Sequence, residues 1–276
     1  MNITIVPIND VEYKEDLIVH SRMKFLKVYR NAIFKGSYTR RRLIKSMMIE
    51  VIVQNGQEAI QAEKLGADRI ELVSAIQEGG LTPSYGTVKQ VLGSVSIPVQ
   101  VMIRPHSYHY CYTDGDLQII REDIKKVLEL GGTNIVFGTL NKNNTINERI
   151  LENIIGVSPQ LDITFHRAFD EVPSLNEAYE TLNKYKENVK RILTSGGEES
   201  CVDGKKKLRD LVSTAKKKDG PKIMPGAGLT HDNIQDIHNT VNADQYHFGK
   251  AIRVDHSFAN DFDENLFKFI NNKLRG

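Results

Sequence analysis

The sequence predicts an α/β protein, a (β/α)8 TIM barrel that follows an extra N-terminal extension. From Met48 onward, short runs rich in β-branched residues alternate with helical patterns, which is typical of βαβ units and a parallel sheet. Eight such repeats fit into about 225 residues, as in a closed barrel. A doubly wound open sheet is the alternative, but it more often has five to seven strands.

Turn signals separate the expected elements. Gly66 follows the first helix, Pro98 precedes the third strand, and Gly131-Gly132 follows the third helix. In chain order, the expected strands are Ile49–Val53, Arg69–Val73, Val99–Arg104, Asn134–Phe137, Asp162–His166, Lys190–Thr194, Lys222–Met224 and Gln245–Phe248. The expected helices are Gln57–Leu65, Ser84–Leu92, Asp116–Leu130, Asn147–Ile155, Leu175–Tyr185, Lys205–Lys216, Asp232–Val241 and Glu264–Leu274.

The first 47 residues do not follow this alternation. They contain 10 Lys and Arg but only 4 Asp and Glu, whereas the rest of the chain is mildly acidic. Charge runs are usually just solvated, so we interpret residues 1–47 as a basic extension dispensable for the fold. Residues 48–276 are then the barrel domain. A basic arm for RNA or a membrane is the alternative reading of the extension.

Composition narrows the class of protein. The chain is 40% hydrophobic and 26% charged, as in soluble globular proteins, and has no run of about 18 apolar residues for a membrane span. The mildly acidic barrel argues against a nucleic-acid partner. Two cysteines, Cys111 and Cys201, make no disulfide framework, which favours a cytoplasmic location.

Strand parity predicts which side chains face the barrel interior, because residues two apart on a strand point the same way. Carboxylates are poorly suited to the apolar layer between strands and helices, so those on the first two strands should point inward. The expected interior therefore holds two carboxylates, one guanidinium and up to two imidazoles, which are Glu50, Glu71, Arg104, His166 and His247.

Polar residues also gather where the fifth strand ends, in Ile163–Asp170. Barrels of this class carry their active sites at the carboxyl ends of the strands. We therefore expect His166, titrating near neutral pH and oriented by Asp170 or another carboxylate, to move a proton while Arg104 clamps an anion. Glu71 completes this candidate catalytic group. The alternative is a satisfied ionic plug that fixes strand register.

Small residues follow the last three strands. Their backbone N–H groups could approach an anion, and barrels that bind phosphate use these late loops. Glycines also simply end strands, which is the alternative. The candidate anion-binding residues are Ser195, Gly196, Gly226, Gly228 and Gly249.

A metal-binding hypothesis rests on His106, His109 and Cys111 after the third strand. Imidazole and sulfur suit copper or zinc, but the spacing His-x-x-His-x-Cys matches no standard zinc pattern. Neighbouring tyrosines favour an ordinary packed loop instead. The cofactor is therefore left unknown, with copper as one candidate.

Six segments of the barrel together resemble the CutC family, which is named for copper homeostasis. They are Gly66–Leu72, Glu78–Ser84, Val101–Pro105, Ile163–Asp170, Arg191–Gly196 and Ile223–Gly228. The resemblance implies a (β/α)8 barrel, a cytoplasmic location, a homodimer, and Cu(I) binding or copper tolerance.

Two of the departures from this family pattern bear on copper binding. Members linked to Cu(I) carry cysteines on the first and second strands, where this chain has Ile52 and Val73. By parity both face the interior, so hydrocarbon replaces a soft thiolate pair. We expect a CutC-like protein of copper homeostasis whose partner is Cu(I) or a small-molecule anion. The alternative is an enzyme or binder of a small anionic or phosphorylated metabolite.

Overall fold

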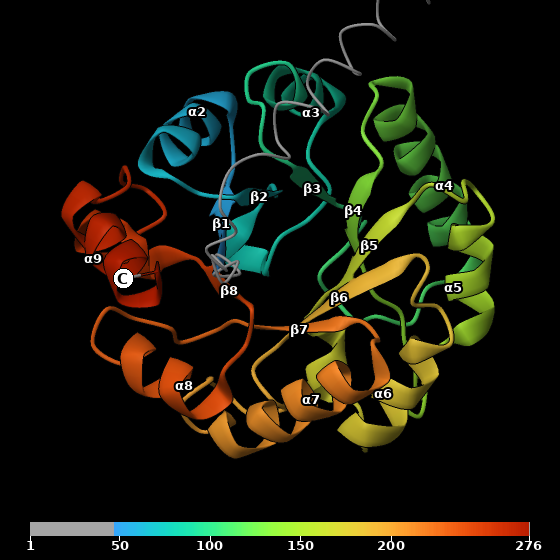
Figure 1. Ribbon diagram of the computed structural model, residues 1–276. Helices are drawn as coiled ribbons and strands as arrows, with labels where there is room; N and C mark the ends of the chain where they lie inside the picture. Colours follow the sequence, from blue (N-terminus) through green and yellow to red (C-terminus); the bar gives the residue numbers. More distant parts are fainter. Residues whose placement is uncertain (1–46, 276) are drawn as a thin grey trace, which may run out of the picture. The chain divides into compact units, whose positions relative to one another are not determined.

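Eight parallel strands form the centre of the structure, a computed structural model that describes residues 47–275 (Figure 1). They are β1 (Met48–Val53), β2 (Arg69–Leu72), β3 (Val99–Met102), β4 (Asn134–Phe137), β5 (Asp162–Phe165), β6 (Val189–Thr194), β7 (Lys222–Pro225) and β8 (Gln245–Phe248). Their hydrogen-bonded order is β7-β6-β5-β4-β3-β2-β1-β8, and β7 also contacts β8. The predicted barrel is confirmed as nearly closed, while the predicted extension lies outside the described residues apart from Met47.

Helices surround this barrel, as Figure 1 shows. They are α2 (Gly56–Leu65), α3 (Tyr85–Leu92), α4 (Asp114–Glu129), α5 (Glu148–Ile155), α6 (Leu175–Asn183), α7 (Lys205–Lys218), α8 (Ile234–Val241) and α9 (Glu264–Arg275). The predicted boundaries differ from these by at most two residues. Capping explains part of the difference, because Ser84 and Asn147 accept backbone hydrogen bonds just before their helices, and Thr113 forms a capping box with Asp116.

The strands separate apolar from polar side chains by parity. Outward-facing residues such as Val51, Ile70 and Ile163 are fully buried between strands and helices. Burying each such side chain stabilises the fold by about 1.5–3 kcal/mol. A second, smaller apolar cluster lies inside the barrel and contains Val73, Met102 and Val136, with Ile52 and Ile76 packed against it.

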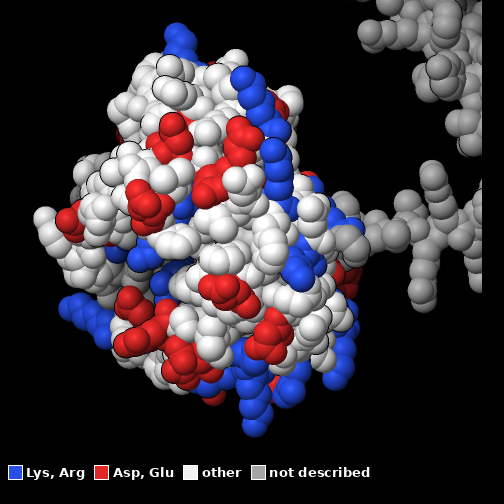
Figure 2. Space-filling view, turned by 90° about the vertical axis from the view of Figure 1, so that its left-hand side faces the viewer, with Lys and Arg blue, Asp and Glu red and all other residues white. Residues whose placement is uncertain are grey.

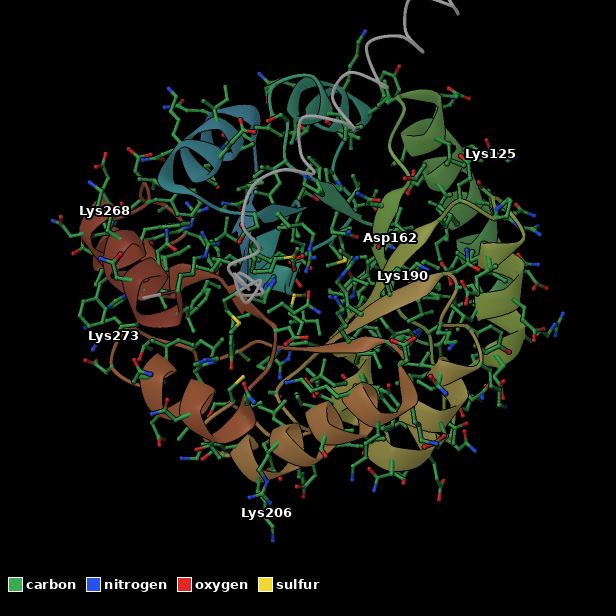
Figure 3. The ribbon with its side chains drawn as sticks, viewed as in Figure 1. Lys125, Asp162, Lys190, Lys206, Lys268 and Lys273 are labelled. Carbon is green, nitrogen blue, oxygen red and sulfur yellow. The ribbon has the colours of Figure 1, made fainter. Side chains whose placement is uncertain are left out.

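Charged residues cover the outside of the helix ring. Figure 2 shows Lys and Arg interspersed with Asp and Glu on the side that carries α9. In Figure 3, Lys125 on α4, Lys206 on α7 and Lys268 on α9 all point away from the barrel. None of the helices in the described part of the chain is long and apolar enough to cross a membrane.

Candidate functional site

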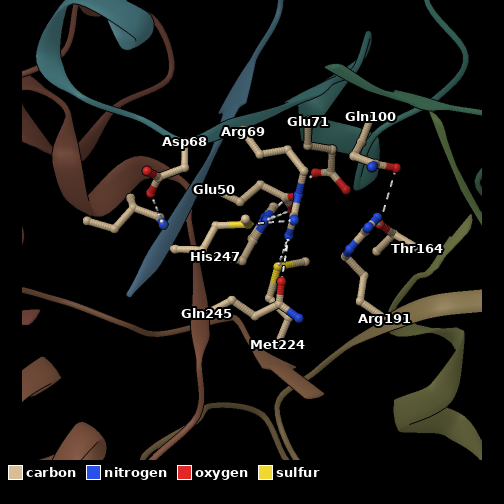
Figure 4. Close-up of polar contacts among 12 residues, drawn as sticks. Glu50, Asp68, Arg69, Glu71, Gln100, Thr164, Arg191, Met224, Gln245 and His247 are labelled. Atoms are coloured by element: carbon tan, nitrogen blue, oxygen red, sulfur yellow. Dashed lines mark hydrogen bonds and ion pairs between the residues drawn. The ribbon is translucent and has the colours of Figure 1, made fainter. Parts of the chain in front are cut away.

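Strand register brings three charged side chains together inside the barrel (Figure 4). Glu50 on β1 is paired with Arg69 on β2 and with His247 on β8. The Nε–H of Arg69 donates to one Glu50 oxygen, and Nδ1 of His247 lies 2.8 Å from the other. Although burial opposes it, the Arg69 charge and the His247 hydrogen bond lower the pKa of Glu50 to about 2.

The guanidinium of Arg69 extends this network below Glu50. It donates to Gln245 over 2.8 Å and lies against the sulfur atoms of Met48 and Met224. A second network at the same end of the barrel joins Arg191 to Asp162 over 2.6 Å. The interior thus holds three guanidinium groups, those of Arg69, Arg104 and Arg191, whereas only that of Arg104 was predicted. Arg69 lies two residues before Glu71 on β2, so the same parity argument could have identified it.

Glu71 lies above this network with one oxygen free of protein partners. Its Oε2 lies 3.6 Å from Nε2 of His247, while its buried Oε1 has no hydrogen-bond partner in the described structure. Burial raises the pKa of Glu71 to about 7, with His247 opposing and Glu50 reinforcing the shift. Burial disfavours a charged His247, but the carboxylates on both sides outweigh it and raise the pKa of His247.

A cavity of about 800 Å³ opens at the carboxyl ends of the strands. Its polar lining includes four of the residues that parity or strand ends had singled out, namely Glu71, Arg104, His166 and His247. Ile52 and Met102 contribute apolar wall, and the loops after β7 and β8 form much of the rim. The size suits a small organic ligand.

Arg104 is the cavity's buried cation. Its Nη atoms donate to the backbone carbonyls of Glu78, Gly80 and Ser107, and its guanidinium lies 4.8 Å from the centre of the Tyr110 ring. The Nε–H has no partner, and none of the ion pairs within residues 47–275 includes this side chain. Arg104 therefore presents a buried positive charge that forms no ion pair with a carboxylate of the described residues.

His166 approaches the same Tyr110 ring from β5, with 4.8 Å between ring centres. Its Nδ1 accepts a hydrogen bond from the backbone N–H of Ala168, so the proton of the neutral ring is on Nε2, which has no partner. Burial and the nearby Arg104 charge lower the pKa of His166 to about 3. The expectation that it titrates near neutral pH is corrected, because the site is too buried and too positive for an imidazolium.

Asp170 does not orient His166 in this structure. Its carboxylate accepts hydrogen bonds from Arg167 at 2.8 Å, from the backbone of Ser195 at 3.1 Å and from Gly197 at 3.0 Å, besides the Thr194 hydroxyl. The backbone donors after β6 are thus occupied by an anion that the chain itself supplies. Gly196 likewise donates to the Thr194 hydroxyl.

The other small-residue candidates divide into two groups. Gly228 and Gly249 line the cavity, together with Lys250. The N–H of Gly226 instead donates to the Thr194 carbonyl, and a Cβ on Gly226 would lie 2.5 Å from the Leu193 side chain and 3.2 Å from that of His247. Gly226 therefore makes room for these two side chains.

The structure does not gather His106, His109 and Cys111 into one ligand set. The rings of His106 and His109 are 4.9 Å apart, but His106 also lies 3.6 Å from Asp116, and the Cys111 thiol donates to the Leu140 carbonyl. Within the described residues, the three-ligand group found is instead Glu50, Glu71 and His247, with donor atoms within 4.8 Å of one another. Arg69, bonded to Glu50, already offsets that negative charge.

Cu(I) as cargo does not fit these interior donors. The positions of the family's paired cysteines hold Ile52 and Val73, which belong to the interior apolar cluster as predicted. The sulfur atoms of Met48 and Met224 lie within 3.1 Å of the Arg69 guanidinium, a cation that would repel a metal ion. Soft thiolate donors of the kind Cu(I) selects are missing from this part of the described chain.

Fold and site together define a (β/α)8 barrel with a cavity lined by polar residues at the carboxyl ends of its strands. The chain belongs to the CutC family, whose sequence model matches residues 47–252. It is 38% identical to the copper homeostasis protein cutC homolog of Homo sapiens and 37% identical to that of Mus musculus, in each case over 200 residues and 72% of both chains. Its structure resembles that of a CutC protein from Streptococcus agalactiae with a TM-score of 0.67 and 32% identity, covering 74% of this chain and 98% of the other. The resemblance noted in the sequence is thereby confirmed.

Proposed function

We propose that this chain acts in copper homeostasis, the role in the names of its mammalian relatives, by binding a small organic anion rather than by holding Cu(I) on thiolates. The observation that carries this proposal is the buried Arg104 at the cavity, with no carboxylate partner in residues 47–275.

A buried charge without a counter-charge is costly, by several kcal/mol in proteins. Backbone carbonyls hold the Nη atoms of Arg104, but they carry no net charge to neutralise it. A ligand carboxylate or phosphate that accepts from the free Nε–H would supply that charge. Gly228, Gly249 and Lys250 at the rim support a ligand with a second polar or anionic group.

Thermal unfolding with pyruvate or inorganic phosphate tests the anion site. At least one of the two should raise the unfolding midpoint of the wild type, because a ligand bound only to the native state stabilises it. Arg104→Met should abolish this rise, whereas Arg121→Met, on the exposed surface of α4, should preserve it. An Arg104→Met protein that responds like the wild type would contradict the proposed site.

The copper role is tested in the cell that carries this gene. Deleting the gene should increase sensitivity to added copper, and the wild type and Arg121→Met should both restore tolerance. Arg104→Met, expressed to the same level, should fail to restore it. Equal rescue by all three proteins would separate copper tolerance from the cavity.

A cytoplasmic location and a homodimer complete the proposal, both on the strength of the family resemblance. Light scattering coupled to size exclusion should give twice the chain mass of 31.2 kDa. A mass of one chain at micromolar concentration would contradict the dimer.

A further inference from the structure

Three residues that line the cavity at the barrel mouth each carry a buried polar atom without a protein partner among the described residues. These atoms are Oε1 of Glu71, Nε of Arg104 and Nε2 of His166. Buried polar groups in native proteins are nearly always hydrogen-bonded, so a group of such atoms around one cavity indicates a ligand. Two are donors, and the third is a carboxylate oxygen that can accept or release a proton.

The two donor residues contact the same aromatic ring. Arg104 and His166 both lie 4.8 Å from the centre of the Tyr110 ring. The hydrogen bond from Ala168 fixes the ring of His166 as the Nε2–H tautomer, which is a neutral donor and not a base. A neutral imidazole donor beside a cation is suited to an oxygen that gains negative charge during a reaction.

Glu71 lies on β2, three strands away from β5. It is in register with Gln100 on β3, and Asn134 on β4 is in register with Asp162 on β5. In an eight-stranded barrel with a shear of about 8, register partners are staggered along the barrel axis. The residue at the same height on the next strand therefore lies roughly one position further along the chain than the register partner. That rule places Glu71 level with the end of β5, where His166 stands.

We propose, building on the proposed function, that the cavity is an acid–base site for a small carbonyl compound bearing an acidic group. Glu71 is the catalytic base, the Nε2–H of His166 donates to the carbonyl oxygen, and the Nε–H of Arg104 donates to the neighbouring acidic group, as in the proposed function. Arg69, Glu50 and His247 act as positioning residues, because their hydrogen bonds hold His247 3.6 Å from Glu71.

The reaction step moves one proton. Glu71 takes it from the carbon next to the carbonyl, and the electron pair of the broken C–H bond forms a C=C bond. The carbonyl π pair moves onto the oxygen, whose negative charge is stabilised by the Nε2–H of His166 and the nearby Arg104 cation. Glu71, now a carboxylic acid, returns the proton to the same carbon as the C=O bond re-forms, so the step exchanges that proton and consumes no oxidant, reductant or second substrate.

Oxalate binding tests this proposal, because oxalate is a planar dianion that mimics the enolate of pyruvate. Calorimetry at pH 8 in buffers of different ionisation enthalpy measures both affinity and the protons taken up. The wild type should bind oxalate at least tenfold more tightly than pyruvate and take up close to one proton, since an enolate mimic is complementary to a protonated Glu71. Glu71→Gln should bind oxalate without taking up a proton.

Further variants separate this proposal from the proposed function. His166→Phe, which removes the donor, should weaken oxalate at least tenfold, His166→Gln should restore part of the affinity through its amide N–H, and Arg121→Met should match the wild type. Oxalate binding that depends on Arg104 but takes up no proton overturns the acid–base proposal and leaves the anion site standing. If only inorganic phosphate binding depends on Arg104, the acid–base proposal alone is overturned, and if oxalate, pyruvate and phosphate binding are all independent of Arg104, both proposals are overturned.

Discussion

Individual side chains in this barrel have their charge states set by burial and by their immediate neighbours. Glu50, between Arg69 and His247, is stabilised as an anion, whereas Glu71, with one oxygen unpartnered, is not. His166 is held neutral because burial disfavours its charged form, and the positive charge of Arg104 lowers its pKa further. Side chains of the same chemical type in one barrel therefore differ in charge state according to their neighbours.

The tautomer and charge of His166 can be measured directly. Nitrogen-15 NMR of labelled histidine should show His166 with an unprotonated Nδ1 and a protonated Nε2, unchanged between about pH 5 and pH 8, because burial and Arg104 lower its pKa to about 3. Exposed His109 serves as the internal reference within the same sample. A midpoint for His166 between pH 5 and pH 7 would contradict the neutral-donor role.

Glu71 should control how stability depends on pH. Its folded pKa of about 7 lies above the unfolded value of 4.5, so the folded state binds more protons and the free energy of unfolding falls as pH rises from about 4.5 to 7. Glu71→Gln removes this pH-dependent loss, so its free energy of unfolding should rise by up to ~3 kcal/mol relative to that of the wild type as pH increases over that range. Urea unfolding at several pH values measures it, with exposed Glu199→Gln as the control.

At the scale of elements, loops and strand ends shape the cavity as much as its polar residues do. Gly138 follows β4, and a Cβ there would lie 2.5 Å from Nδ1 of His166. The loop after β6 is organised by Asp170 from the turn after β5, which satisfies the amides of Ser195 and Gly197. Neighbouring strand ends thus fix one another's side chains.

Replacing Gly138 by Ala should therefore displace the His166 ring. We expect a loss of about 1–3 kcal/mol in the free energy of unfolding, as in other overpacked sites, together with weaker oxalate binding. Gly86→Ala on α3 is the matched control, because its Cβ would meet nothing closer than the Ser84 hydroxyl at 3.9 Å. Equal effects of the two substitutions in urea unfolding would show that Gly138 does not position the ring.

We expect Asp170→Ala to destabilise the loop after β6. It leaves the amides of Ser195 and Gly197 without their acceptor, at a cost of ~1–3 kcal/mol for each group that water cannot reach. Urea unfolding and amide hydrogen exchange should both report the loss. Exposed Asp232→Ala should leave both unchanged, and an Asp170→Ala protein as stable as the wild type would argue against this structural role.

For the whole molecule, periodicity predicted the fold because a barrel repeats one simple unit eight times. Strand parity correctly predicted that the side chains of Glu50 and Glu71 point into the barrel, since a carboxylate cannot pack in the apolar layer between strands and helices. The individual partners could not be predicted in the same way. The Ser195 amide donates to Asp170, and the Nη atoms of Arg104 donate to backbone carbonyls. Both contacts depend on loop conformations, which strand periodicity does not specify.

The central claim is that this CutC-family barrel has kept the fold and the polar mouth without an interior thiolate site for copper. Its interior wall is hydrocarbon at Ile52 and Val73, and we propose that its buried cation at Arg104 binds an anion. The most direct test is an anaerobic Cu(I) competition titration of the reduced protein against a chelator of known affinity. We predict no competition beyond that of an unrelated protein with two free thiols. Tight binding of one Cu(I) per chain would contradict the claim and direct attention to Cys111 and its neighbouring histidines.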